Sequence, residues 1–157
     1  MKKTLIKLLS LLIATRYGLI AKQSWQDSGD PARIRTKILT VGRSLKFLGL
    51  VDNGISLQTI SADYSNMFRS WLALQACLLF LGVWWLLCGH RKGLYVIIGL
   101  TVLGLALEAN PAVDYSFEVD KTEAVRQAKH ELAIVGCLLV LAASSSFKYA
   151  RIVKFSP

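Results

Sequence analysis

The chain has 157 residues, of which 54% are hydrophobic and 18% charged, and its mean hydropathy is +0.45. This composition is too apolar for a disordered chain, and the length suits one domain with a short extension. Nineteen Lys and Arg against ten Asp and Glu give a net charge of +9. Because the cations flank or interrupt apolar runs, they indicate contact with anionic membrane lipids rather than with nucleic acid.

The first expected element is a basic helix over about residues 1–22, with no acidic residue before Asp27. Lys3, Lys7 and Ser10 lie on one helical side, and an apolar side is formed by Leu5, Leu9, Leu12 and Ile13. The pattern predicts an uncleaved amphipathic helix at the membrane interface, within an N-terminal segment and linker of residues 1–35. A mitochondrial presequence has a similar basic, acid-free composition.

The second expected element is a membrane span over about residues 36–56. Arg43 and Lys46 interrupt its apolar run near the middle, where each charge costs about 2.5 to 3.5 kcal/mol on insertion scales. Both side chains are therefore expected to snorkel, to face the bundle interior or to line a wet cavity.

Three further spans are expected over about residues 70–88, 93–109 and 126–147. Gln75 is the only strongly polar residue in the run 71–88, which is nearly long enough to cross a bilayer core. A short basic turn containing Arg91 and Lys92 joins this span to the next, and Asn110-Pro111 ends the third span. The glycines Gly82, Gly99, Gly104 and Gly136 are expected to allow close contact between helices.

The distribution of charge favours four spans with both chain ends on one basic side, because loops on the cytoplasmic or matrix side carry an excess of Lys and Arg. The opposite side receives a long acidic loop over residues 110–127. The predicted fold is therefore all-α: an integral membrane four-helix bundle of residues 36–157, preceded by the N-terminal amphipathic interfacial helix.

Four stretches resemble the DoxX family and the related surfeit-type membrane cargo receptors, which are four-helix membrane proteins. They are Gly42-Arg43 with the turn at residues 50–55, the Leu-rich run 78–87 with its basic turn, the Leu/Gly-rich run 94–107, and residues 129–139. The resemblance spans about residues 36–146. It implies one of several roles: membrane subunit of a quinone-linked oxidoreductase, export receptor, or accessory piece of a larger complex.

The candidate contact residues for lipid or a partner subunit are Arg43, Lys46, Arg91 and Lys92, because cations inside or beside membrane spans bind anionic headgroups or acidic side chains. His90 and His130 are expected at opposite membrane faces, too far apart to share a metal or haem. Cys77, Cys88 and Cys137 lie in apolar runs without a metal-ligand spacing. No catalytic residue, cofactor site or metal site is predicted.

The sequence therefore favours a non-catalytic accessory subunit of a multi-subunit membrane complex of the energy-transducing, respiratory-chain type, with anionic lipids and other membrane subunits as partners. The alternatives are a quinone-linked membrane subunit and a cargo or lipid-handling receptor. The mitochondrial inner membrane is the favoured location, and the endoplasmic reticulum and the bacterial plasma membrane remain alternatives.

Overall fold

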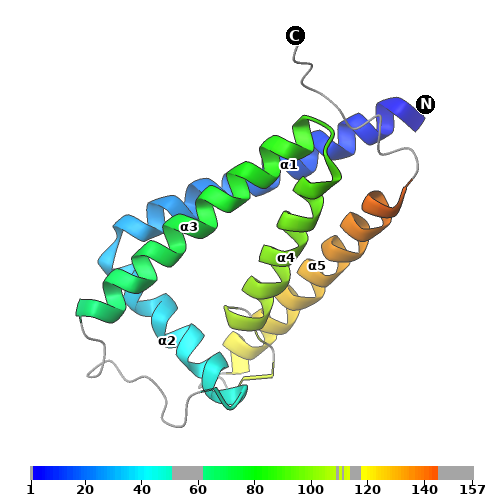
Figure 1. Cartoon of the computed structure of the whole chain (residues 1–157). Helices are drawn as coiled ribbons and strands as arrows, with labels where there is room; N and C mark the ends of the chain where they lie inside the picture. The colour runs from blue at the N-terminus through cyan, green and yellow to red at the C-terminus, as the bar shows by residue number, and fades with distance from the viewer. Residues whose placement is uncertain (1, 51–61, 109, 111, 114–117, 145–157) are drawn as a thin grey trace.

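The computed structural model describes the chain apart from residues 1, 51–61, 109, 111, 114–117 and 145–157. Within the described residues the regular structure is entirely helical, which confirms the all-α prediction. The five helices are α1 (Lys2–Gly29), α2 (Pro31–Phe47), α3 (Ala62–Leu87), α4 (Arg91–Leu107) and α5 (Glu118–Ala143) (Figure 1).

α1 and α3 run side by side and antiparallel, and they form the most extensive helix pair in the structure (Figure 1). The buried face of α1 is built mainly from small side chains at intervals of three, four or seven residues, namely Ser10, Ala14, Ala21, Ser24 and Ser28. Because residues at this spacing share one helix face and are short, they let another helix approach closely. α1 is therefore part of the bundle core.

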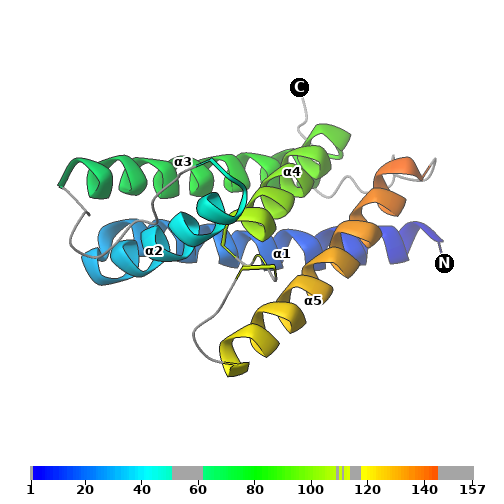
Figure 2. The same cartoon turned by 90° about the horizontal axis from the view of Figure 1, so that it is seen from below.

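α2 lies across the end of the bundle where α1 finishes (Figures 1 and 2). Asp30 separates the two helices and caps α2: its carboxylate accepts hydrogen bonds from the backbone N–H groups of Ala32 (2.9 Å) and Arg33 (3.5 Å). Pro31 occupies the first helical position, where its missing N–H is not needed. The apolar side of α2 packs on α3 through Ile34 and Ile38 against Leu72.

The turn between α3 and α4 brings these helices together closely. Gly89 has a φ of +79° and closes α3, because few other residues adopt this left-handed conformation. Four residues later, a Cβ on Gly93 would lie 2.4 Å from the carbonyl oxygen of Gly82 and 2.6 Å from the amide nitrogen of Leu86. Backbone therefore packs on backbone at this crossing.

α5 lies along α4 and returns to the end of the bundle at which α1 begins; its first turns splay away from the other helices in Figure 2. The end of α5 packs there through Leu138 and Leu141 against Ile6, Leu86 and Leu94. We call this the hairpin end, since it holds the α3–α4 turn. The opposite end, where α2 lies against the C-terminal part of α1 and the start of α3, is called the α2 end.

Two described helices are long and apolar enough to cross a membrane: α1 over Thr4–Gly29 and α3 over Tyr64–Leu87. At 1.5 Å per residue, α4 with its 17 residues is about 26 Å long. α2 is equally short and carries five Lys or Arg side chains, so its composition does not suit a span.

The first span and the N-terminal segment thus differ from the sequence prediction. Residues 2–29 form one continuous helix, α1, whose Ser10 is fully buried in the core, where an interfacial helix over about residues 1–22 and a linker were expected. The predicted span 36–56 is instead the polar α2, and residues 51–56 lie outside the described part. Predicted helices at 70–88, 93–109 and 126–147 correspond to α3, α4 and α5, with α3 and α5 each beginning eight residues earlier.

Candidate functional site

A cavity of about 710 Å³ lies inside the bundle, lined by α1, α3, α4 and α5 and by Lys37 of α2. This volume falls in the range of small-molecule binding sites, about 300–1,000 Å³. Many of the lining side chains are polar or charged, although the helices that carry them are mostly apolar. The polar lining residues are Arg16, Tyr17, Gln23, Ser24, Asp27, Lys37, Gln75, Thr101, Glu108, Gln127 and Glu131.

An ion pair bridges the cavity between α1 and α5. Arg16 Nη2 donates to Glu131 Oε1 at 2.5 Å, and the two side chains are 33% and 18% exposed. The guanidinium of Arg16 also lies over the ring of Tyr17, 5.8 Å from its centroid. A charge-assisted hydrogen bond of this kind is stronger than a neutral one, especially where water has limited access. The pair therefore fixes the middle of α5 against α1.

A second bridge joins α1 to α4 through two hydroxyl groups. The Oγ1 atom of Thr101 lies 3.1 Å from the phenolic oxygen of Tyr17 and 2.8 Å from the carbonyl oxygen of Ile97. Because Thr101 has a single hydroxyl proton, which the carbonyl of Ile97 can only accept, Tyr17 is the consistent donor to Thr101. The buried phenol of Tyr17 is thereby satisfied.

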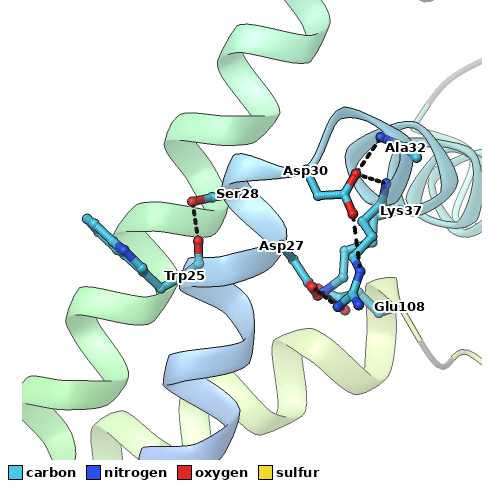
Figure 3. A network of polar contacts seen from close by, with 8 residues as sticks. Trp25, Asp27, Ser28, Asp30, Ala32, Lys37 and Glu108 are labelled. Atoms are coloured by element: carbon cyan, nitrogen blue, oxygen red, sulfur yellow. Dashed lines mark hydrogen bonds and ion pairs between the residues drawn. The ribbon is translucent and has the colours of Figure 1, made fainter.

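Charged side chains of three helices meet at the α2 end of the cavity (Figure 3). Lys37 of α2 lies with its Nζ atom 3.1 Å from a carboxylate oxygen of Glu108 and 3.6 Å from one of Asp27. Asp27, which is only 3% exposed, also accepts a 2.5 Å hydrogen bond from Arg33. This cluster connects α2 to the last turn of α1 and to the end of α4.

The position of these carboxylates explains why the cations are needed. Asp27 and Glu108 both lie at C-terminal helix ends, where the negative end of the helix dipole disfavours an anion. Lys37 offsets this repulsion for both carboxylates. The hydrogen bond and charge of Asp27 in turn raise the pKa of Arg33 above its ordinary value.

The four contact residues predicted from the sequence lie outside the cavity and at opposite ends of the molecule. Arg43 and Lys46 are exposed on α2, and neither turns toward the bundle interior. Arg91 and Lys92 are exposed at the start of α4, where Arg91 donates to the carbonyl oxygen of Ser144 at 2.9 Å. The structure does not bring the two pairs of cations together.

Sequence reasoning missed the cavity residues because it assigned them to surfaces. Arg16 lies within the helix that was predicted at the membrane interface, and Glu131 lies near the start of the predicted span 126–147, so neither was expected to line a cavity. The available signal was polarity within long apolar runs: Arg16 inside residues 8–20 and Gln75 inside residues 71–88.

The histidines and cysteines form no cluster in the described part of the chain. His90 begins α4 at the hairpin end and His130 lies in the first half of α5; both are exposed. The three thiols are free. No group of three or more His, Cys, Asp or Glu side chains among the described residues has the arrangement of a metal site.

Comparisons with protein-family models, with curated proteins and with solved structures give no match for this chain. The resemblance to the DoxX and surfeit-type families, and the quinone-linked and cargo-receptor functions it implies, therefore stay predictions.

Proposed function

We propose that the chain is an integral membrane protein that crosses the bilayer with α1, α3, α4 and α5 and acts as a non-catalytic accessory subunit of a larger membrane complex. One observation carries the membrane proposal: large apolar side chains of the long helices point outward, while the Arg16–Glu131 and Lys37–Glu108 ion pairs line the internal cavity. Soluble monomers rarely expose such large apolar surfaces. The exposed large apolar residues include Leu5, Leu8, Leu12, Leu19, Leu74, Phe80, Trp84, Val102, Leu103, Leu139 and Val140.

The arrangement of helix ends supports four crossings. α1 begins at the hairpin end, α3 returns to it, α4 leaves it and α5 returns to it again. The start of α1 and the end of α5 then lie on the same side of the bilayer. This differs from the predicted charge distribution, because α1 replaces residues 36–56 as the first span and the five cations of α2 lie on the opposite side. α2 lies flat at the opposite membrane surface in this arrangement.

The exposed cations of α2 support the subunit role. Arg43 and Lys46 are accessible at the α2 end and have no ion-pair partner among the described residues. At the level of the headgroups they suit anionic lipids or carboxylates of a neighbouring subunit. We place the complex in an energy-transducing membrane, with the mitochondrial inner membrane favoured by the basic, acid-free stretch before Asp27.

Membrane crossing predicts that Lys46 and Lys92 lie on opposite sides of the bilayer. In a variant without the three native cysteines, Lys46→Cys and Lys92→Cys are introduced separately, and sealed vesicles are treated with an impermeant maleimide. We expect one position to react in right-side-out vesicles and the other only after permeabilisation. Labelling of both from one side, or release of the chain by alkaline carbonate without detergent, would contradict the four crossings.

The subunit role predicts that other membrane proteins co-purify with the full chain in mild detergent. We expect a stoichiometric set whose recovery falls several-fold in the double variant Arg43→Gln/Lys46→Gln, because charge-assisted contacts to the partner are lost. Lys129→Gln removes an exposed cation of α5 and is the matched control. A chain that purifies alone from its native membrane would overturn the role, while leaving the membrane crossing intact.

A further inference from the structure

The cavity opens sideways between α1 and α5. Three of its lining residues are exposed on the surface, Leu19 and Gln23 of α1 and Gln127 of α5, and they mark its mouth. The first turns of α5 splay away from the other helices at this side of the bundle (Figure 2). Beyond Tyr17, toward the hairpin end, the core is packed with apolar side chains such as Leu86. The cavity is therefore a blind pocket with a lateral mouth.

The mouth lies where the outer surface changes from polar to apolar. On α1 the exposed side chains are mainly apolar from Leu8 to Leu19, and Lys22 begins a mainly polar stretch. On α5 the exposed side chains are polar up to His130 and apolar from Leu132 onward. In the proposed membrane arrangement, such a boundary is the level of the lipid headgroups on the side of the α2 end. The mouth therefore faces headgroups.

The Arg16–Glu131 ion pair lies beside this mouth. Arg16 is one helical turn from Leu19, and Glu131 is one turn from Gln127. The two charged side chains stay 33% and 18% exposed, and their contact joins one terminal nitrogen to one carboxylate oxygen. A guanidinium has five N–H donors and a carboxylate has about four acceptor sites, so each can bind another group while the pair remains intact. The pair thus presents a cation and an anion side by side.

A zwitterionic ligand suits such a pair better than a ligand of single charge. A single charge that approaches one member of the pair is repelled by the other, whereas an anionic group at Arg16 and an ammonium at Glu131 give four charges that alternate in sign. Phosphate and ammonium groups both form charge-assisted hydrogen bonds with such partners. Lys37, the other cation in the described lining, is already shared by two carboxylates. Arg16 is therefore the expected phosphate ligand.

The apolar wall of the pocket favours a lipid over a small soluble zwitterion. Leu19 and Ile20 of α1, Leu79 of α3, and Leu100 and Leu105 of α4 form this wall. Leu19 is 62% exposed, so the wall continues to the surface that the bilayer covers in the proposed arrangement. Binding sites commonly combine an apolar lining with a few polar groups that fix orientation. A ligand with hydrocarbon chains can contact this wall, whereas a free amino acid cannot.

We infer that the pocket binds the headgroup of a zwitterionic phospholipid that carries a primary ammonium. Arg16 binds the phosphate, Glu131 accepts hydrogen bonds from the ammonium, and the acyl chains pass Leu19 into the bilayer. The inference rests on the proposed membrane crossing, because lateral entry requires lipid beside α1 and α5. Binding leaves the lipid chemically unchanged.

Gly104 allows the pocket to be filled while the ion pair stays intact. It shares the pocket face of α4 with Leu100 and Glu108 at four-residue spacing, and a Cβ built on it meets no atom within 4 Å. Gly104→Leu therefore places a side chain into the pocket. Gly99 also has open space around a built Cβ but is exposed and does not line the pocket, so Gly99→Leu is the matched control.

The test uses the full chain in phosphatidylcholine nanodiscs that contain a small fraction of a probe phospholipid with a diazirine in its acyl chain, close to the glycerol. After irradiation, the labelled residues are mapped by mass spectrometry. With a phosphatidylethanolamine probe, we expect adducts around Leu19 and Leu105 that disappear in Gly104→Leu and persist in Gly99→Leu. A phosphatidylcholine probe should label these residues roughly three- to tenfold less, because its trimethylammonium cannot donate a hydrogen bond to Glu131.

A second pair of variants tests the assignment of the ammonium to Glu131. Glu131→Gln should abolish the preference for the phosphatidylethanolamine probe over the phosphatidylcholine probe. Glu123→Gln is the matched control, because Glu123 is an exposed carboxylate of α5 that pairs with Arg126 and does not line the pocket. If Glu131→Gln does not fold, the comparison of Gly104→Leu with Gly99→Leu still decides whether the probe occupies the pocket.

Several results would overturn the inference. Equal labelling of wild type and Gly104→Leu would show that the lipid does not occupy the pocket, and equal labelling by the two probes would refute recognition of the ammonium. Stronger labelling by a phosphatidylglycerol probe would assign the site to a singly anionic head. Complete competition by millimolar phosphoethanolamine would assign it to a soluble ligand. Because carbonate extraction and maleimide labelling test the membrane crossing independently, failure of the pocket and failure of the proposed function are distinguishable.

Discussion

Gly93→Ala is expected to lower the thermal stability of the detergent-solubilised protein strongly. The added Cβ would lie within 2.6 Å of the Gly82 carbonyl oxygen and the Leu86 amide nitrogen, which are backbone atoms and not the ends of flexible side chains. α3 and α4 must therefore move apart, and overpacking of this kind costs roughly 1–3 kcal/mol or more. The measurement is the midpoint of unfolding followed by tryptophan fluorescence.

Gly99→Ala on the same helix is the control for Gly93→Ala. Its Cβ meets nothing within 4 Å, and alanine is a better helix former than glycine by about 1 kcal/mol in aqueous hosts. The midpoint of unfolding should then stay the same or rise. If Gly93→Ala were as stable as Gly99→Ala, the close backbone contact between α3 and α4 would be refuted.

Breaking the Arg16–Glu131 pair from either side is the second change with a large expected effect. Glu131→Gln leaves the Arg16 guanidinium uncompensated over the Tyr17 ring, at the junction of α1 and α5. Removing one partner of a buried ion pair lowers the free energy of unfolding by about 3–5 kcal/mol. For Glu131→Gln we expect a loss of about 3 kcal/mol or less, because the Arg16 side chain is 33% exposed and water can partly solvate its charge. The free energy of unfolding in detergent would report the loss.

A double variant separates the pair from the individual side chains. Arg16→Leu/Glu131→Leu removes both charges, and replacing a buried pair by apolar residues is often neutral or stabilising. We expect it to be more stable than Glu131→Gln alone. Additive losses in the two single variants and the double variant would mean that Arg16 and Glu131 do not interact.

The helical fold and the course of α3, α4 and α5 could be predicted because their apolar runs are long and end in clear stop signals. The Gly89 turn and the Asp30-Pro31 start of α2 are also local in sequence. α1 was misplaced because three early lysines and Arg16 resemble the polar side of an interfacial helix. Its series of small residues from Ser10 to Ser28 is the pattern typical of a closely packed helix.

The pocket could not be predicted in the same way, because it depends on contacts between distant parts of the chain. Arg16 and Glu131 are 115 positions apart, and Lys37 and Glu108 are 71 apart. No periodicity or motif links such pairs in a single sequence. The predicted role of the glycines in helix contacts was also only partly right. Gly82 makes the expected close contact between helices, whereas Gly99, Gly104 and Gly136 have open space around a built Cβ.

If the chain crosses the bilayer with four helices as proposed, the unequal lengths of these helices determine which bilayer thickness suits it. α3, with 26 residues, is about 39 Å long, whereas α4 spans about 26 Å, and a hydrocarbon layer is about 30 Å thick. If α4 stood perpendicular to the membrane, the bilayer around it would have to become thinner. The longer helices α1 and α3 would have to tilt to keep their apolar residues within the hydrocarbon layer. Such hydrophobic mismatch carries a modest free-energy cost per ångström, so the proposed arrangement predicts that the protein prefers thinner bilayers to sterol-rich ones.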